Sequence, residues 1–269
     1  PLIVLKERRK SAAWRKIRET IVVGSLVLCA LFSIFVTFSI VVILFTETVR
    51  FFGMPEVSLG EFFFSAEWNP LMGSEKHFGI WPLISGTLMV AVIAALVSIP
   101  LGLITAVYLS EYAPTRVRST LKPVLEILAG IPTVVYGFFA LTVITPALRG
   151  VSSFVTSPFV EGEGGRSVFE YFNSTSAGLA VGIMCLPIVC SLSEDALRAV
   201  PRSLREGAYA LGSTRFDVSV KVVVPAALSG VIASFLLALA RAVGETMIVA
   251  LAAGGLARMA YNPADGAQT

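Results

Sequence analysis

The sequence predicts an all-α protein that crosses a membrane several times, and three observations lead to this class. Of its 269 residues, 55% are apolar and 14% are charged, whereas a soluble domain of this size carries about 25% charged residues. Five stretches of 19 to 33 residues contain no charge, and crossing the hydrocarbon core takes about 20 apolar residues in a helix. These stretches are also too continuously apolar for the alternating strands of a membrane barrel.

We expect one spanning helix in each charge-free stretch. Pro100 and Pro187 fall inside the second and fourth stretches, which membrane helices tolerate better than soluble ones. The expected parts are a basic segment 1–19, a first helix 20–46, an external loop 47–77, and a core 78–257. The core contains helices near 78–110, 127–148, 171–193 and 226–254 and a cytoplasmic loop 194–225, and an external segment 258–269 follows it.

Orientation follows from the bias of Lys and Arg toward the cytoplasmic side. With the N-terminus inside, the inner segments hold 15 of these residues and the outer segments hold 5. We therefore expect a multi-pass protein of the bacterial cytoplasmic (inner) membrane with a cytoplasmic N-terminus. Five spans then leave 258–269 outside, where this short polar segment reads as a connection to a sixth helix that the sequence does not include.

Composition argues against several other kinds of site. The net charge of +3 offers no case for nucleic-acid binding. Cys29, Cys185 and Cys190 fall inside apolar stretches, where they act as small hydrophobes, and their spacing suggests neither a metal site nor a disulfide. His77 has no neighbouring ligands. In the outer loop, Phe62, Phe63, Phe64 and Trp68 form either an interfacial aromatic belt with Trp81 or a docking surface for an external partner.

The cytoplasmic loop 194–225 is polar but organised. Pro201 suits the first turn of a helix over 202–211, which Gly212 would end. Thr214 and Asp217 have the spacing of a capping box, which predicts a second short helix. These two helices could lie on the membrane surface or insert into a partner protein. Glu194 and Asp195, just before them, read as a solvated rim.

The stretch 206–225, EGAYALGSTRFDVSVKVVVP, resembles the E-A-A loop of bacterial ABC-importer permeases. That pattern runs Glu-Ala-Ala, three residues, Gly, nine residues, then Ile-x-Leu-Pro. Glu206, Ala208, Gly212 and Pro225 fall in its register, while Gly207, Val222 and Val224 replace an Ala, an Ile and a Leu. The resemblance implies a type I, MetI-like helical bundle, of which five spans are present.

In such permeases this loop seats in a groove of a separate ATPase subunit. The resemblance assigns the coupling role to Glu206, Gly207, Ala208, Gly212 and Pro225, with the Glu206 carboxylate for partner hydrogen bonds and Ala208 and Gly212 for close approach. The chain has no G-x-x-x-x-G-K-[ST] phosphate loop. We therefore expect a transporter subunit that is not itself an enzyme and binds no cofactor, with ATP and Mg²⁺ on the partner ATPase.

Four further segments, 78–88, 126–139, 191–216 and 240–255, resemble the phosphate-specific permeases, and the run Gly244-Glu245-Thr246-Met247 is similar to their PstC type. The resemblance implies import of inorganic phosphate with a PstA-type second permease, a homodimeric PstB-type ATPase and a PstS-type external binding protein. The alternatives are a permease for molybdate, sulfate or phosphonate, or a secondary transporter, although no inverted repeat is visible.

Arg241 and Glu245 are the charges inside the last apolar stretch. In one continuous helix they would share a face as an i, i+4 pair, and Arg241 would lie about 24 Å from Pro225 along the axis. They form either a self-contained packing pair or an oxyanion site in which Glu245 holds Arg241.

Two hydroxyl-bearing residues of the third helix, Thr133 and Tyr136, either allow close packing or line the pathway. Glu126 is expected in that helix's first turn, where the dipole alone favours a carboxylate.

Overall fold

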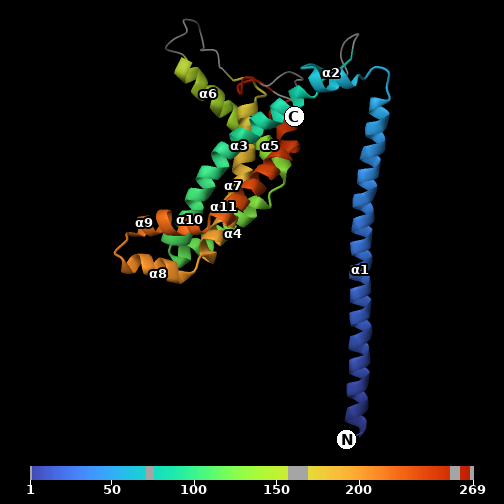
Figure 1. Ribbon diagram of the computed structural model, residues 1–269, viewed down its shortest axis with the longest axis vertical. Helices are drawn as coiled ribbons and strands as arrows, with labels where there is room; N and C mark the ends of the chain where they lie inside the picture. Colours follow the sequence, from blue (N-terminus) through green and yellow to red (C-terminus); the bar gives the residue numbers. More distant parts are fainter. Residues whose placement is uncertain (1, 71–75, 157–168, 255–260, 267–269) are drawn as a thin grey trace. The chain divides into compact units, whose positions relative to one another are not determined.

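The computed structural model describes residues 2–70, 76–156, 169–254 and 261–266, and its spanning elements are helices (Figure 1). The chain divides into two compact units, residues 1–59 and 60–269. Each is described by itself below.

The first unit is dominated by one long helix. Helix α1 (Leu2–Phe52) has 51 residues, which gives about 77 Å at 1.5 Å per residue, and its candidate membrane span is Trp14–Phe52. No boundary separates the basic segment 1–19 from the apolar stretch 20–46, because the sequence offers no proline or turn there. The helix runs on until Gly53, beyond which the chain turns.

The second unit begins with a short helix and a hairpin. Helix α2 (Leu59–Phe64) is followed by strands β1 (Trp68–Asn69) and β2 (His77–Phe78), which pair antiparallel. The rings of Trp68 and Phe78 meet edge to face at 6.2 Å between centroids, and Trp81 Nε1 donates to Phe63 O at 2.8 Å. Several aromatic residues of the outer loop therefore support one another.

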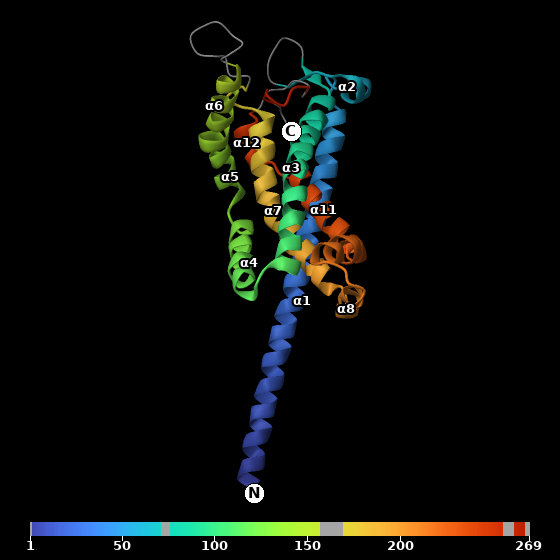
Figure 2. The same ribbon diagram turned by 90° about the vertical axis from the view of Figure 1, so that its left-hand side faces the viewer.

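Helices α3 (Trp81–Val107) and α7 (Ser174–Ala199) form the centre of the bundle (Figure 2). They approach closely where one of them carries glycine, as membrane helices commonly do. A Cβ at Gly178 would lie 2.6 Å from Ile93 Cβ, and one at Gly102 would lie 2.7 Å from Val189 Cβ. Both contacts are too short for any side chain, so these positions set the spacing of the two helices.

The third expected helix, 127–148, is displaced and divided. Helix α4 (Thr115–Ala129) ends before Pro132, and helix α5 (Thr133–Phe139) then continues through the π-helical turn η2 (Ala140–Ile144) into α6 (Thr145–Thr156). Pro132 lacks the N–H that a continuing helix needs. The expectation for Glu126 is wrong: it lies in the last turn of α4, not in a first turn.

Helix α7 is longer than the charge-free stretch 171–193, and the loop 194–225 contains the two short helices that the sequence predicts. These are α8 (Arg202–Ala210) and α9 (Arg215–Asp217). Gly212 has φ +80°, a conformation that favours glycine at a helix end. Thr214 Oγ1 accepts from the backbone N–H of Asp217 at 3.2 Å, which confirms the expected cap.

The last expected helix, 226–254, is broken at two points. The π-helical turn η3 (Val218–Val223) and α10 (Val224–Ala226) lead into α11 (Leu228–Val243) through a bend of 71°. Gly244 then ends α11, and α12 (Met247–Ala252) begins after Thr246. Four described helices are long and apolar enough to cross a membrane, or five if the bent pair counts as one.

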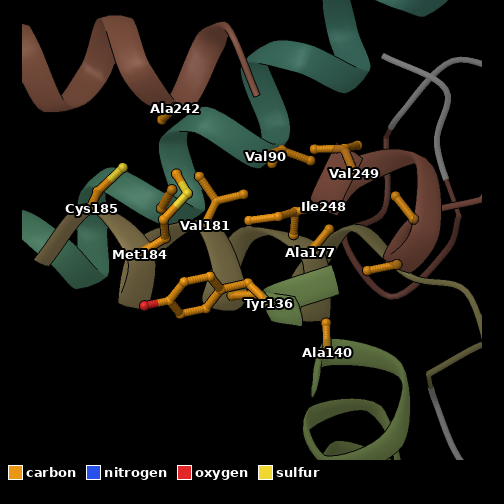
Figure 3. Close-up of a cluster of buried hydrophobic side chains, with 14 of the residues drawn as sticks. Val90, Tyr136, Ala140, Ala177, Val181, Met184, Cys185, Ala242, Ile248 and Val249 are labelled. Atoms are coloured by element: carbon orange, nitrogen blue, oxygen red, sulfur yellow. The ribbon is translucent and has the colours of Figure 1, made fainter. Parts of the chain in front are cut away.

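Two clusters of small and medium apolar side chains hold these helices together. The first joins α3, α5, α7, α11 and α12 around Val181, Met184 and Ile248 (Figure 3). The second lies nearer the short helices α8 to α10 and includes Leu109, Leu197 and Val218. Because Ala and Val predominate, the helix backbones pack closely, which is the usual way of stabilising a bundle in lipid.

Candidate functional site

Glu245 is buried at the break between α11 and α12, with 7% of its surface exposed. Its Oε1 accepts from the backbone N–H groups of Met247 at 3.2 Å and Ile248 at 3.3 Å. The first N–H groups of a helix have no partner within it and carry partial positive charge. The Glu245 side chain therefore satisfies the first N–H groups of α12, and Glu245 itself lies in the break, outside the helix that carries Arg241.

Arg241 lies in the last turn of α11 and forms no hydrogen bond or ion pair with any described residue. The expected Arg241–Glu245 pair on one helix face is therefore wrong, because the break at Gly244 turns the carboxylate toward α12. The charges of Arg241 and Glu245 both act on the thiol of Cys185 on α7, so both residues lie near this part of α7.

Arg241 lies near the end of α11 that is farthest from the bend. Counted from Leu228, where α11 begins, it is about 20 Å along the axis at 1.5 Å per residue. Arg241 is next to the buried stripe that includes Ser234 and Ala238, and its own side chain is exposed and bonds no described residue.

Tyr136 closes the break between α4 and α5. Its ring is buried in the first apolar cluster (Figure 3), and its hydroxyl donates to Leu128 O at 2.8 Å. This contact satisfies a carbonyl at the end of α4, so packing accounts for Tyr136. Thr133 is half-buried at the start of α5 and makes no hydrogen bond with any described residue, which leaves its hydroxyl available.

Glu194, which the sequence placed on a solvated rim, is instead 1% exposed. Its Oε1 accepts from Arg118 Nε at 2.6 Å and lies 3.6 Å from Arg198 Nη1, and its Oε2 lies 3.3 Å from Lys122 Nζ. Arg118 and Lys122 belong to α4, so this carboxylate ties α4 to α7. The rim expectation holds for Asp195, which is 58% exposed, but is wrong for Glu194, because Arg118 and Lys122 lie over 70 residues away in sequence.

Lys122 also bonds the exposed neighbour of Glu194, with its Nζ 2.8 Å from Asp195 Oδ1. The hydrogen bond to Asp195, together with the charges of both carboxylates, raises the pKa of Lys122 against a smaller opposing effect of burial. A raised lysine pKa stabilises the fold fully below the ordinary lysine pKa, and this contribution is lost only as the pH rises through the folded value. The Lys122 side of the contact between α4 and α7 is therefore charged near neutral pH.

The coupling residues predicted from the loop lie on and after α8. Glu206 is exposed on α8, and a Cβ at Gly207 or Gly212 would meet nothing within 4 Å. Ala208 packs inward on the second cluster, and Pro225 lies in α10, two residues before the bend. The structure thus gives Ala208 a packing role and Gly212 a backbone role, whereas Glu206 and Gly207 face open space.

A cleft of about 470 Å³ lies beside α8. Its lining combines η1 (Tyr108–Tyr112), the π-helical turn after α3, with the start of α4, the end of α7 and one side of α8, and includes Arg118, Arg202, Arg205, Glu111 and Glu206. The candidate site thus has two parts. The first is the guanidinium of Arg241 on α11, which bonds no described residue. The second is the set of exposed short helices at the other end of α11.

Comparison with known proteins bears on both parts. Residues 98–269 match the family described as "Binding-protein-dependent transport system inner membrane component". The chain belongs to this family, and it is the permease subunit of an ABC transporter and a multi-pass inner-membrane protein. The expected fold class, an all-α permease bundle, is confirmed.

Several curated relatives of this chain are phosphate transport permeases. The chain is 38% identical to a probable ABC transporter permease protein, YqgH, of Bacillus subtilis, over 90% of this chain and 73% of that one. It is 31% identical to the phosphate transport system permease protein PstC of Pasteurella multocida, over 80% of this chain and 74% of that one. The PstC of Xylella fastidiosa (strain Temecula1) is 37% identical, over 74% of this chain and 62% of that one. The recognition of a PstC-type permease is thereby confirmed.

Proposed function

We propose that this chain is a permease through which an ATP-driven importer moves inorganic phosphate into the cytoplasm by alternating access. The observation that carries the proposal is Arg241, an exposed guanidinium in the last turn of α11 that bonds no described residue. An unpaired Arg in hydrocarbon is costly, so such residues face a bundle interior or a water-filled path and serve function. The names of several relatives, which are phosphate transport permeases, support the same substrate.

The chemistry of Arg241 suits a tetrahedral oxyanion. Its planar fork donates two parallel hydrogen bonds to such a group. Glu245 keeps a negative charge close by while its oxygen is held by α12, so it limits the affinity without neutralising Arg241 directly. Thr133 adds a neutral donor, and Tyr136 supports the path by fixing the break before α5. Molybdate, sulfate and phosphonate remain the competing substrates, because the same fork suits them.

The partners of this permease follow from its class. An ABC transporter requires an ATPase, and we assign that role to a homodimer of the PstB type that binds ATP and Mg²⁺. A PstA-type permease completes the path, and a PstS-type protein delivers phosphate from outside. This chain carries no cofactor and hydrolyses nothing itself, since its sequence has no phosphate loop.

The proposed orientation has the N-terminus and α8 in the cytoplasm, as the Lys and Arg bias indicates. Cysteine labelling tests it, with Ser203→Cys on α8 and Ser58→Cys in the loop after α1. In intact cells, a membrane-impermeant maleimide is expected to label Ser58→Cys at once and Ser203→Cys only after permeabilisation. The reverse order would overturn the orientation.

Charge reversal at Glu206 is expected to uncouple the permease from its ATPase. Glu206 is exposed on α8 and bonds no described residue, so Glu206→Lys leaves the fold intact and places a cation where the ATPase expects an acceptor. Co-purification of the ATPase and its stimulation by the loaded binding protein should fall together. The control is Ser119→Lys, which introduces the same side chain at an exposed position of α4. Unchanged co-purification and stimulation in Glu206→Lys would refute the coupling role.

A further inference from the structure

Arg205 joins α8 to two other helices through one guanidinium. Its Nη1 donates to Val200 O at 2.6 Å, and its Nη2 donates to Leu197 O at 2.7 Å and to Glu111 Oε1 at 3.1 Å. The side chains of Arg205 and Glu111 are 17% and 8% exposed. This is a buried ion pair that also satisfies backbone carbonyls.

The two partners of Arg205 belong to different spanning elements. Leu197 and Val200 lie at the end of α7, where carbonyls lack partners within the helix and favour a cation. Glu111 lies in η1 (Tyr108–Tyr112), the π-helical turn that continues α3, and such turns are frequent at functional sites. A planar guanidinium can bridge both at once, whereas an ammonium is a single point charge.

The rest of α8 has no comparable link. Among the described residues, no other side chain of this helix forms a hydrogen bond or ion pair. The cleft described above separates α8 from η1 and the start of α4, and both Arg205 and Glu111 line it. Besides the packing of Ala208 on the second cluster and the contact of α8 with η3, Arg205 is therefore the polar link between this helix and the bundle among the described residues.

We infer that Arg205 is a positioning residue that transmits movement of α8 to the cytoplasmic ends of α3 and α7. This inference rests on the proposed function, in which α8 follows the ATPase. If α8 moved without Arg205, Glu111, whose side chain is 8% exposed, would lose its cation and keep only the hydrogen bond from Ser110 Oγ at 2.9 Å, which is unfavourable. The ends of α3 and α7 therefore follow α8, and their close packing at Gly102 carries the movement into the membrane.

The test uses the full complex in proteoliposomes and measures the phosphate transported per ATP hydrolysed. Arg205→Met keeps the length of the side chain and removes all three hydrogen bonds. We expect this ratio to fall about tenfold or more, as for loss of a charge-assisted bond to a buried carboxylate, while the complex still assembles. The matched control is Arg116→Met on α4, an exposed arginine whose side chain bonds no described residue and lies outside the cleft lining, which should leave the ratio unchanged.

Further variants separate transmission from a merely structural role. Arg205→Lys, which keeps the charge, should give an intermediate ratio, and it serves as the readout if Arg205→Met fails to assemble. Glu111→Gln alone should lower the ratio of phosphate transported to ATP hydrolysed. Combined with Arg205→Met, it should lower this ratio no further than Arg205→Met alone does. An unchanged ratio in both Arg205 variants would overturn the inference, as would a lower complex yield with normal coupling. Wild-type complex that transports no phosphate would instead refute the proposed function.

Discussion

Replacing Arg241 with glutamine is expected to abolish phosphate uptake while the permease still assembles with its partners. The side chain bonds no described residue, so its removal costs little in folding. The loss of two charge-assisted hydrogen bonds to the anion, about 3 kcal/mol in total, lowers uptake about 100-fold or more. Uptake of labelled phosphate measures the loss of transport, and co-purification of the ATPase measures assembly.

The matched control places glutamine one turn earlier on the same helix. Leu237→Gln puts the same amide at another exposed position of α11 and leaves Arg241 in place, so uptake should persist. Arg241→Lys keeps the charge but loses the planar fork, and its uptake should fall between the two. Normal uptake in Arg241→Gln would remove Arg241 from the pathway.

Replacing Glu194 with glutamine is expected to destabilise the contact between α4 and α7. The substitution leaves Arg118 and Lys122 facing a buried amide in place of a carboxylate. Breaking a buried pair costs about 3–5 kcal/mol, and since these two cations are about a quarter exposed, we expect the lower part of that range. Thermal unfolding of the purified permease in detergent measures the loss.

Its control is the adjacent carboxylate. Asp195 pairs with the same Lys122 but is 58% exposed, and exposed pairs contribute less than about 1 kcal/mol. Asp195→Asn should therefore shift the unfolding temperature much less than Glu194→Gln. Equal shifts would show that Glu194 is not the buried centre of this contact.

Much of the fold could be predicted from local signals. The apolar stretches containing Pro100 and Pro187 became α3 and α7, because length and continuous hydrophobicity alone decide whether a segment can span a membrane. Pro201, Gly212 and the Thr214–Asp217 cap marked the short cytoplasmic helices, since each acts within one turn of chain.

The site was harder to predict because it depends on where helices stop and which distant residues meet. The break at Gly244 lies inside a mainly apolar run, and counting residues along a continuous helix paired Arg241 with Glu245 wrongly. The signal was present: a glycine, then a carboxylate, can end one helix and begin another. For Glu194 the sequence offers only the i, i+4 spacing to Arg198, and its burial could not be predicted because Arg118 and Lys122 reach it only through the packing of α4 on α7.

The most direct test of the central claim is ATP-dependent uptake of labelled phosphate into proteoliposomes that contain this permease, its partner permease and the ATPase, with the external binding protein added. We predict uptake that requires ATP on the ATPase side and is competed by unlabelled phosphate but not by equal concentrations of sulfate or molybdate. Uptake that proceeds without ATP, or that sulfate or molybdate displaces as well as phosphate does, would contradict this assignment.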